Sequence, residues 1–174
     1  MYLFTLGYEK LQPESYVKAL IDAGVKLVVD VRENPWSQRP AYVGGTLRRS
    51  LEAANIEYSH WKLLGNPARI RKTARTASQC LRQYRAYLNQ DPNALHLLLE
   101  EIRCLERQGI ALCLTCYERD PNKCHRSVIV NELVRRESSL RPIHLQPESP
   151  GRKQSRRQST AAFLRPASLP FTFE

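Results

Sequence analysis

The chain has 174 residues, a hydrophobic fraction of 42% and a charged fraction of 25%, which is typical of one globular domain able to bury a core. No apolar run approaches the roughly 18 residues that cross a bilayer, and MYLFTLGYEK lacks the basic leader of a signal peptide, so we expect a cytoplasmic protein that does not contact membranes. The net charge of +10 favours anionic partners, either small molecules or nucleic acid.

The first predicted elements are a strand, a helix and a second strand. YLFTLGY (2–8) has the aromatic and apolar residues of a strand and reaches Gly7 near its end. QPESYVKALIDAGV (12–25) is typical of a helix, because Pro13 suits the first helical position and Gly24 a C-terminal stop. KLVVDVR (26–32) is a continuous apolar run that ends in charged residues, which favours a strand buried on both faces of a parallel sheet.

The same alternation continues to residue 145. Helices are expected over 47–54, 79–90, 91–109 and 125–137, and strands over 56–61, 110–115 and 141–145. Five strands alternating with helices predict an α/β fold, a single layered domain over 1–145 with a mostly parallel sheet of about five strands flanked by helices. Residues 146–174 are rich in Pro, Ser and Arg without periodicity, so we expect a basic, flexible tail there.

Three loops at the carboxyl ends of predicted strands carry most of the candidate chemistry. They are LGYEK (6–10), DVRENPWSQRP (30–40) and TCYERDPNKCHR (115–126), and each has more charged and aromatic residues than a plain connection requires. In an open parallel sheet, ligands bind beyond the carboxyl ends of the strands, where the strand order reverses. We therefore expect the loops to meet around a binding site.

The third loop contains two candidate nucleophiles. The chain has five cysteines and no secretion signal, so we expect reduced thiols. Cys116 ends a strand, while Cys124, His125 and Arg126 begin a helix, where free N–H groups and the dipole attract anions and lower the pKa of a thiol. This predicts one or two activated thiols, with His125 and Arg126 as anion-binding residues. The alternative is that the cysteines are small core hydrophobes.

A metal site is a further alternative for this loop. Cys113, Cys116, Cys124 and His125 form a C-x2-C-x7-C-H pattern with ligands of the types that zinc prefers. However, Cys113 and Cys116 point to opposite faces of a strand, and we expect the adjacent Cys124 and His125 to diverge at the helix start. The sequence therefore favours chemistry without a metal, and we expect no cofactor.

Other candidates lie at the same strand ends. Asp30 and Arg32 leave the second strand on the same side, so they either brace the loops as an ion pair or act as a base and an anion clamp. Glu118 could carry a proton for Cys116, although an ordinary surface charge explains it equally well. Tyr8 and Trp36 could line a pocket.

A basic stretch runs from Tyr58 to Gln90, where no Asp or Glu occurs. Its basic residues are Lys62, Arg69, Arg71, Lys72, Arg75, Arg82 and Arg85. Such a stretch is either a contact for a polyanion such as nucleic acid or a solvated basic face. LGNPARIRK (64–72) is expected to form a loop that can bring Arg69 or Arg71 to the site.

Three segments together resemble the domain-of-unknown-function family 488, the YeaO-like proteins. They are TLGYEKLQPESYVKALIDAGVKLVVDVRENPWSQRP, IEYSHWKLLGNP and CYERDPNKCHRSVIVNEL. The resemblance implies a single α/β domain but no reaction, and it carries over the residues Asp30, Arg32, Pro35, Cys116, Glu118, Cys124, His125 and Arg126. In layout the chain is also distantly similar to flavodoxin-like folds and to rhodanese-type sulfurtransferases and cysteine phosphatases, although the interval from Cys116 to Arg126 exceeds the anion loop of the last two.

The leading hypothesis is an enzyme that acts on a phosphate-bearing or other anionic substrate. Cys116 or Cys124 would be the nucleophile, Glu118 or Asp30 the proton carrier, and the guanidinium groups of residues 32 and 126 the anion clamps. The alternative is a non-enzymatic nucleic-acid-binding module that uses the basic stretch, with structural cysteines. A lesser possibility is a redox or persulfide relay between the two cysteines.

Overall fold

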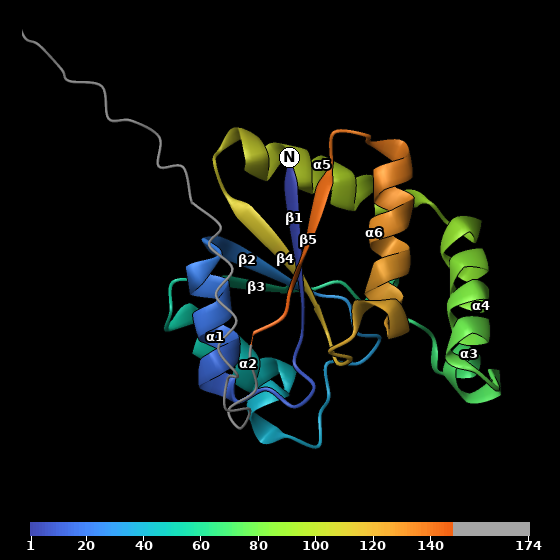
Figure 1. Ribbon diagram of the computed structural model, residues 1–174, viewed down its shortest axis with the longest axis horizontal. Helices are drawn as coiled ribbons and strands as arrows, with labels where there is room; N and C mark the ends of the chain where they lie inside the picture. The colour runs from blue at the N-terminus through green and yellow to red at the C-terminus, as the bar shows by residue number, and fades with distance from the viewer. Residues whose placement is uncertain (148–174) are drawn as a thin grey trace, which may run out of the picture.

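The fold is built on one sheet of five parallel strands. The computed structural model describes residues 1–147. The strand order is β3-β2-β4-β1-β5, and all neighbouring strands run parallel (Figure 1). The strands are β1 (Tyr2–Gly7), β2 (Val25–Asp30), β3 (Glu57–His60), β4 (Ala111–Cys116) and β5 (Arg141–Leu145). The predicted α/β fold with a parallel sheet of five strands is confirmed.

The strand order determines where a ligand can bind. The chain places β1 and β2 two positions apart, and β4 later enters between them. The carboxyl ends of β1, β4 and β2 therefore lie side by side in the middle of the sheet, which is where open α/β sheets bind ligands. Flavodoxin-like sheets have the order 2-1-3-4-5, so the likeness to that class is limited to the layers.

Helices cover both faces of the sheet. They are α1 (Pro13–Asp22), α2 (Gly44–Glu52), α3 (Ala68–Thr73), α4 (Ala77–Gln90), α5 (Asn93–Arg107) and α6 (His125–Arg136). Helices α1 and α2 pack on one face and α5 and α6 on the other, with α3 and α4 outside α6 (Figure 1).

Each face of the sheet has its own apolar core. Val28 and Cys113 point toward α1 and α2, while their neighbours Val29 and Leu114 point toward α5 and α6. Successive residues of a strand face opposite sides, so a strand covered on both faces needs apolar residues at every position. This explains why the second predicted strand is a continuous apolar run rather than an alternating one.

The start of α2 and the structure of residues 64–72 differ from the prediction. Helix α2 begins at Gly44 rather than at 47, because the Gly44 N–H donates to the Pro35 carbonyl over 2.7 Å and holds the chain in place for the first turn. Residues 64–72, expected to be a loop, contain most of α3, which buries Ile70. This helix has only six residues, too few turns for a helical period to be visible in the sequence.

Pro147, the last residue that the structure describes, lies close to the β4–α6 loop. Nη2 of Arg119 donates to the carbonyl of Pro147 over 2.8 Å. Apart from residues 146 and 147, the predicted tail lies outside the described residues. Within 1–147, none of the helices has both the length and the apolar content to cross a membrane.

Gly7 permits a close backbone contact between the end of β1 and the β4–α6 loop. A Cβ atom at this position would collide with the Glu118 carbonyl and lie 2.8 Å from Nη1 of Arg126. We expect Gly7→Ala to lower the free energy of unfolding by about 1–3 kcal/mol, because the β4–α6 loop must move. Urea denaturation measures this change.

Gly45→Ala is the matched control, since a Cβ there meets nothing within 4 Å. It should leave the free energy of unfolding unchanged or raise it by up to about 1 kcal/mol. Equal urea midpoints for the two variants would contradict the close contact at Gly7.

Candidate functional site

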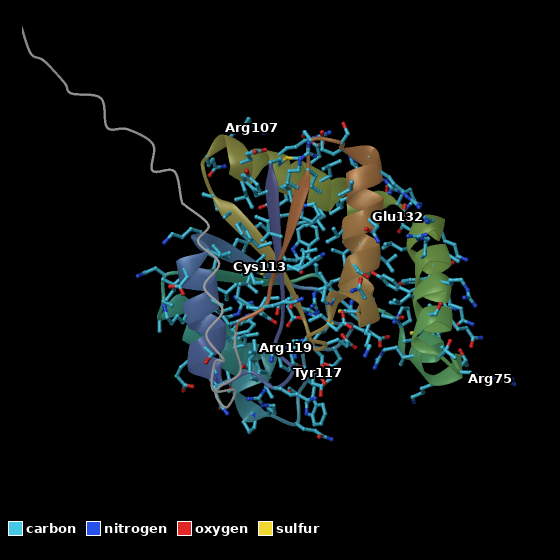
Figure 2. The ribbon with its side chains drawn as sticks, viewed as in Figure 1. Arg75, Arg107, Cys113, Tyr117, Arg119 and Glu132 are labelled. Atoms are coloured by element: carbon cyan, nitrogen blue, oxygen red, sulfur yellow. The ribbon has the colours of Figure 1, made fainter. Side chains whose placement is uncertain are left out.

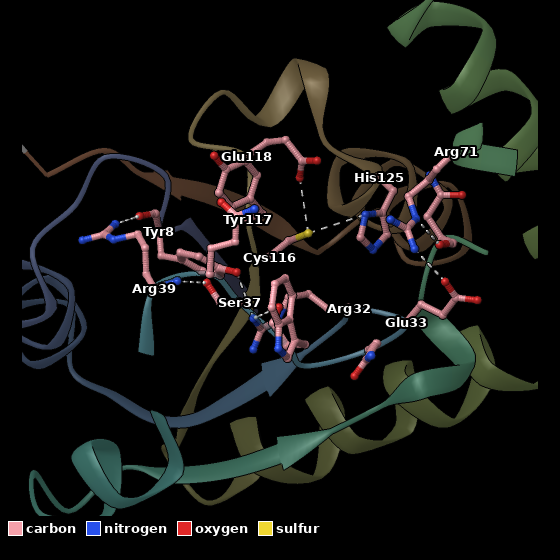
Figure 3. Close-up of a pocket in the computed structure, with 14 residues that line it drawn as sticks. Tyr8, Arg32, Glu33, Ser37, Arg39, Arg71, Cys116, Tyr117, Glu118 and His125 are labelled. Atoms are coloured by element: carbon pink, nitrogen blue, oxygen red, sulfur yellow. Dashed lines mark hydrogen bonds and ion pairs between the residues drawn. The ribbon is translucent and has the colours of Figure 1, made fainter. Parts of the chain in front are cut away.

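A pocket of about 420 Å³ lies beyond the carboxyl ends of β1, β2 and β4. Its walls come from Tyr8 after β1, from segment 32–39 after β2, from 116–118 at the end of β4 and from His125 at the start of α6 (Figure 3). Asn66 and Arg71 complete the lining. The three loops identified in the sequence thus meet around one cavity.

Cys116 is the cysteine that lines this pocket, with 4% of its surface exposed. Its Sγ lies 3.3 Å from Oε2 of Glu118 and 3.6 Å from Nδ1 of His125 (Figure 3). A carboxylate and an unprotonated imidazole nitrogen both accept hydrogen bonds, so the thiol can donate its proton to either group.

His125 has one ring orientation that suits a base. Its Nε2 lies 2.7 Å from the carbonyl oxygen of Val31, and because a carbonyl only accepts, Nε2 carries a proton. In the neutral ring the lone pair is therefore on Nδ1, which faces Cys116. Burial disfavours the imidazolium, but the hydrogen bond with Cys124 and neighbouring polar groups outweigh it and raise the pKa of His125. The structure thus pairs His125 with a thiol, whereas the sequence predicts an anion-binding residue at this position.

Cys124 occupies the N-cap position of α6 and is fully buried. Burial, together with the neighbouring Cys116, raises the pKa of the Cys124 thiol above its ordinary value. Burial therefore works against the activated thiol expected at this helix start, because a thiolate would lose its hydration there.

Four potential metal ligands nevertheless converge here. The donor atoms of Cys116, Glu118, Cys124 and His125 all lie within 4.8 Å of one another. The expectation that Cys124 and His125 diverge is wrong. Cys124 precedes the first helical residue and has extended backbone angles (φ −110°, ψ 141°), so its side chain does not follow helical geometry. Cys113 lies in the interior on the opposite face of the sheet, as expected (Figure 2).

Asp30 and Arg32 form a buried ion pair beside the pocket. Nη2 of Arg32 lies 2.5 Å from Oδ2 of Asp30, and Nε donates to both carboxylate oxygens over 2.9 and 3.0 Å. The Tyr58 hydroxyl also donates to Asp30 over 2.7 Å, and Nη1 of Arg32 donates to the Tyr8 hydroxyl and the Tyr42 carbonyl, each over 2.9 Å.

These contacts bear on the two roles considered for the pair. Burial works against the charge on Arg32, but the hydrogen bond and attraction of Asp30 outweigh it, so the pKa of Arg32 is raised. Asp30 is fully buried and does not line the pocket, which does not fit a proton carrier. The geometry fits the bracing role for Asp30. Arg32 braces the loops and also lines the pocket, so anion binding by Arg32 stays a prediction.

Arg126 also contacts the protein rather than the pocket. It is 1% exposed, and its guanidinium donates to the carbonyls of Glu118 and Arg119 and to Oγ1 of Thr5. It is absent from the pocket lining. This placement does not fit the anion clamp expected for Arg126, because its donors hold the β4–α6 loop instead.

The two arginines of segment 64–72 lie in different places. Arg71 lines the pocket and bonds Oε2 of Glu33 over 2.8 Å, while 53% of its side chain stays exposed. Arg69 lies outside the pocket, and its guanidinium stacks over the ring of Tyr87 at 5.4 Å. Of the pair, Arg71 is therefore the one that a ligand in this pocket can contact.

Seven residues that line the pocket were not predicted individually, namely Glu33, Asn34, Ser37, Gln38, Arg39, Asn66 and Tyr117. Arg39 donates to the Tyr8 carbonyl over 3.1 Å and stacks on Tyr42, a contact that no local pattern indicates. Asn66 is 5% exposed, and its Oδ1 has no hydrogen-bond partner among the described residues. Tyr117 is 47% exposed and lines the pocket. Its position next to Cys116 in the sequence was the one signal that could have predicted this.

Comparison with known proteins places the chain in a family. The family model described as domain of unknown function DUF488 matches residues 12–133. The chain belongs to the DUF488 family. The pocket residues from Arg32 to His125 lie within the DUF488 match, whereas Tyr8 precedes it. No curated protein and no solved structure matches the chain.

Asp30→Asn tests the ion pair. This variant keeps the shape of the side chain but leaves the buried Arg32 without its counter-charge, so we expect the free energy of unfolding to fall by about 3–5 kcal/mol. Asp22→Asn is the control, because it breaks the exposed pair with Lys18 and should cost less than about 1 kcal/mol. Similar decreases in the free energy of unfolding for both variants, measured by urea denaturation, would show that the buried Asp30 pair stabilises the fold no more than an exposed pair does.

Proposed function

We propose that this chain is a cysteine-dependent enzyme of the cytoplasm, a transferase or hydrolase acting on a phosphate-bearing or other small anionic substrate. Cys116 is its nucleophile and His125 its general base. The observation that carries this proposal is the 3.6 Å contact between Sγ and Nδ1, with Nε2 bonded to the Val31 carbonyl and both residues lining the pocket. A nucleophile, a base within reach and a third group that orients the base form a recurring catalytic arrangement.

The proposed reaction moves one proton and one group at a time. Cys116 gives its thiol proton to Nδ1 of His125, and the thiolate attacks the electrophilic atom of the substrate. The bond to the leaving group breaks as the bond to sulfur forms, and the leaving group takes the proton from His125. Water or a second substrate then displaces the group from sulfur, and its proton returns through His125 to the Cys116 thiolate.

Two features support an anionic substrate. Arg71 lines the pocket with more than half of its side chain exposed, and the chain as a whole carries a net charge of +10. A guanidinium binds phosphate or carboxylate through two parallel hydrogen bonds. Glu118 accepts from the resting thiol and repels a thiolate, so it is a second proton acceptor rather than an anion ligand.

Alkylation with iodoacetamide tests the proposed nucleophile. At neutral pH we expect Cys116 to react before Cys80 and Cys104, which are half-exposed, and phosphate compounds that fill the pocket should slow it. His125→Gln removes the base and should slow the labelling of Cys116 by about 100-fold. Peptide mass spectrometry measures the rate at each cysteine. Labelling of Cys116 no faster than Cys80, unaffected by phosphate compounds, would overturn the proposal.

A second candidate function is nucleic-acid binding through the basic stretch. Six of the basic residues are exposed, namely Lys62, Arg69, Arg71, Lys72, Arg75 and Arg82. Arg75 lies between α3 and α4, away from the sheet (Figure 2). Arg85 differs, because its Nε lies 3.2 Å from the buried carboxylate of Glu132 and joins α4 to α6. The exposed members are the ones that could contact phosphates.

Charge reversal tests this candidate. If the stretch binds nucleic acid, affinity for DNA or RNA should fall steeply as salt rises, and Arg71→Glu with Arg75→Glu should weaken it and flatten the salt dependence. The same charge change at Arg48 and Arg49, exposed on α2, is the control and should have a smaller effect. No association at low salt, measured by fluorescence anisotropy, would remove this function.

A further inference from the structure

The proposed thiol reaction leaves part of the cluster unexplained. It uses Cys116 and His125, but Sγ of the fully buried Cys124 and the carboxylate of Glu118 lie within the same 4.8 Å. Cys124 has no part in that reaction, and Glu118 only duplicates the proton acceptor that His125 already provides. Their presence indicates a second use of the four side chains.

The distances within the cluster fit a tetrahedral metal site. Zinc binds sulfur at about 2.3 Å and nitrogen or oxygen at about 2.0–2.2 Å, so the donor atoms of a tetrahedral site lie about 3.3–3.8 Å apart. Sγ of Cys116 lies 3.3 Å from Oε2 of Glu118 and 3.6 Å from Nδ1 of His125. The remaining pairs, all within 4.8 Å, need only small side-chain movements.

His125 is oriented as a metal ligand would be. Histidines that bind metals donate their other ring N–H to a carbonyl or carboxylate, which directs the free nitrogen at the ion. Here Nε2 donates to Val31 over 2.7 Å, and Nδ1 points into the cluster. The same hydrogen bond therefore serves either a base or a ligand.

We propose that Cys116, Glu118, Cys124 and His125 bind one Zn²⁺ ion, and that the bound ion blocks the thiol reaction. Two sulfurs, one imidazole and one carboxylate favour zinc over magnesium or calcium, which prefer oxygen ligands alone. Cys116, Glu118 and His125 line the pocket, so the ion can enter from solvent. Binding releases the two thiol protons to water and occupies both Sγ of Cys116 and Nδ1 of His125, which leaves neither nucleophile nor base.

Metal titration of the full chain tests the ligand set. The reduced, chelator-treated protein is titrated with Co²⁺, followed by competition with Zn²⁺. We expect one ion per chain, with the visible bands of tetrahedral cobalt and a sulfur-to-cobalt charge-transfer band. Cys124→Ser should weaken Zn²⁺ binding by more than about 100-fold, because even residues that only support a ligand cost 10–100-fold. Cys104→Ser, in a half-exposed cysteine outside the cluster, should bind as the original chain does.

Glu118→Gln provides a second test if Cys124→Ser does not fold. Glu118 is half-buried at the pocket, and the amide keeps its size while removing a charged ligand, so weaker Zn²⁺ binding with an unchanged melting temperature supports the site. Absence of metal binding, or binding unchanged by both Cys124→Ser and Glu118→Gln, would overturn the proposed site.

Alkylation with and without metal tests the blocking effect. Equimolar Zn²⁺ should stop iodoacetamide labelling of Cys116 in the original chain, and the protection should disappear in Cys124→Ser. Binding of Zn²⁺ without protection of Cys116 would overturn the blocking role. The labelling rate of Cys116 in the absence of metal tests the proposed nucleophile separately. The proposed enzyme function and the proposed Zn²⁺ site can therefore fail independently.

Discussion

The buried ion pair between Asp30 and Arg32 determines the shape of the pocket wall. Burial of two opposite charges costs several kcal/mol per ion, and attraction offsets this cost only when the remaining polar atoms are also hydrogen-bonded. Tyr58 satisfies Asp30, while Tyr8 and the carbonyl of Tyr42 satisfy Arg32. The pair therefore joins the ends of β1, β2 and β3 to the segment after β2, which cannot move away without leaving a buried charge unpaired.

Two side chains at the start of α6 hold neighbouring loops, the one after β2 and the one after β4. His125 bonds the Val31 carbonyl, and Arg126 bonds the carbonyls of Glu118 and Arg119. Both side chains use backbone oxygens that would otherwise be unsatisfied in a buried loop. Cys116 thus lies between two fixed segments, and its neighbours are in place before any ligand arrives.

The arrangement of elements was predictable, but the direction of individual side chains was not. Apolar runs indicate the strands, and the helices between them indicate a parallel sheet. A parallel sheet brings the carboxyl ends of its strands to one edge, so the convergence of the three loops could be predicted. The direction of the Cys124 side chain depends on backbone angles at the N-cap that no spacing reveals. Arg126 likewise could face a ligand or a carbonyl, and only the path of residues 118–119 decides between these.

The late arrival of β4 at the centre of the sheet has a consequence for folding. Leu3 of β1 pairs with Leu112, and Leu27 of β2 pairs with the same residue from the other side. While the chain leaves the ribosome, β2 can pair with β3, but among the described strands β1 has no partner until β4 and β5 have been made. Long-range pairing of this kind slows folding, so this domain should depend more on its surroundings during synthesis than a sheet built from successive neighbours.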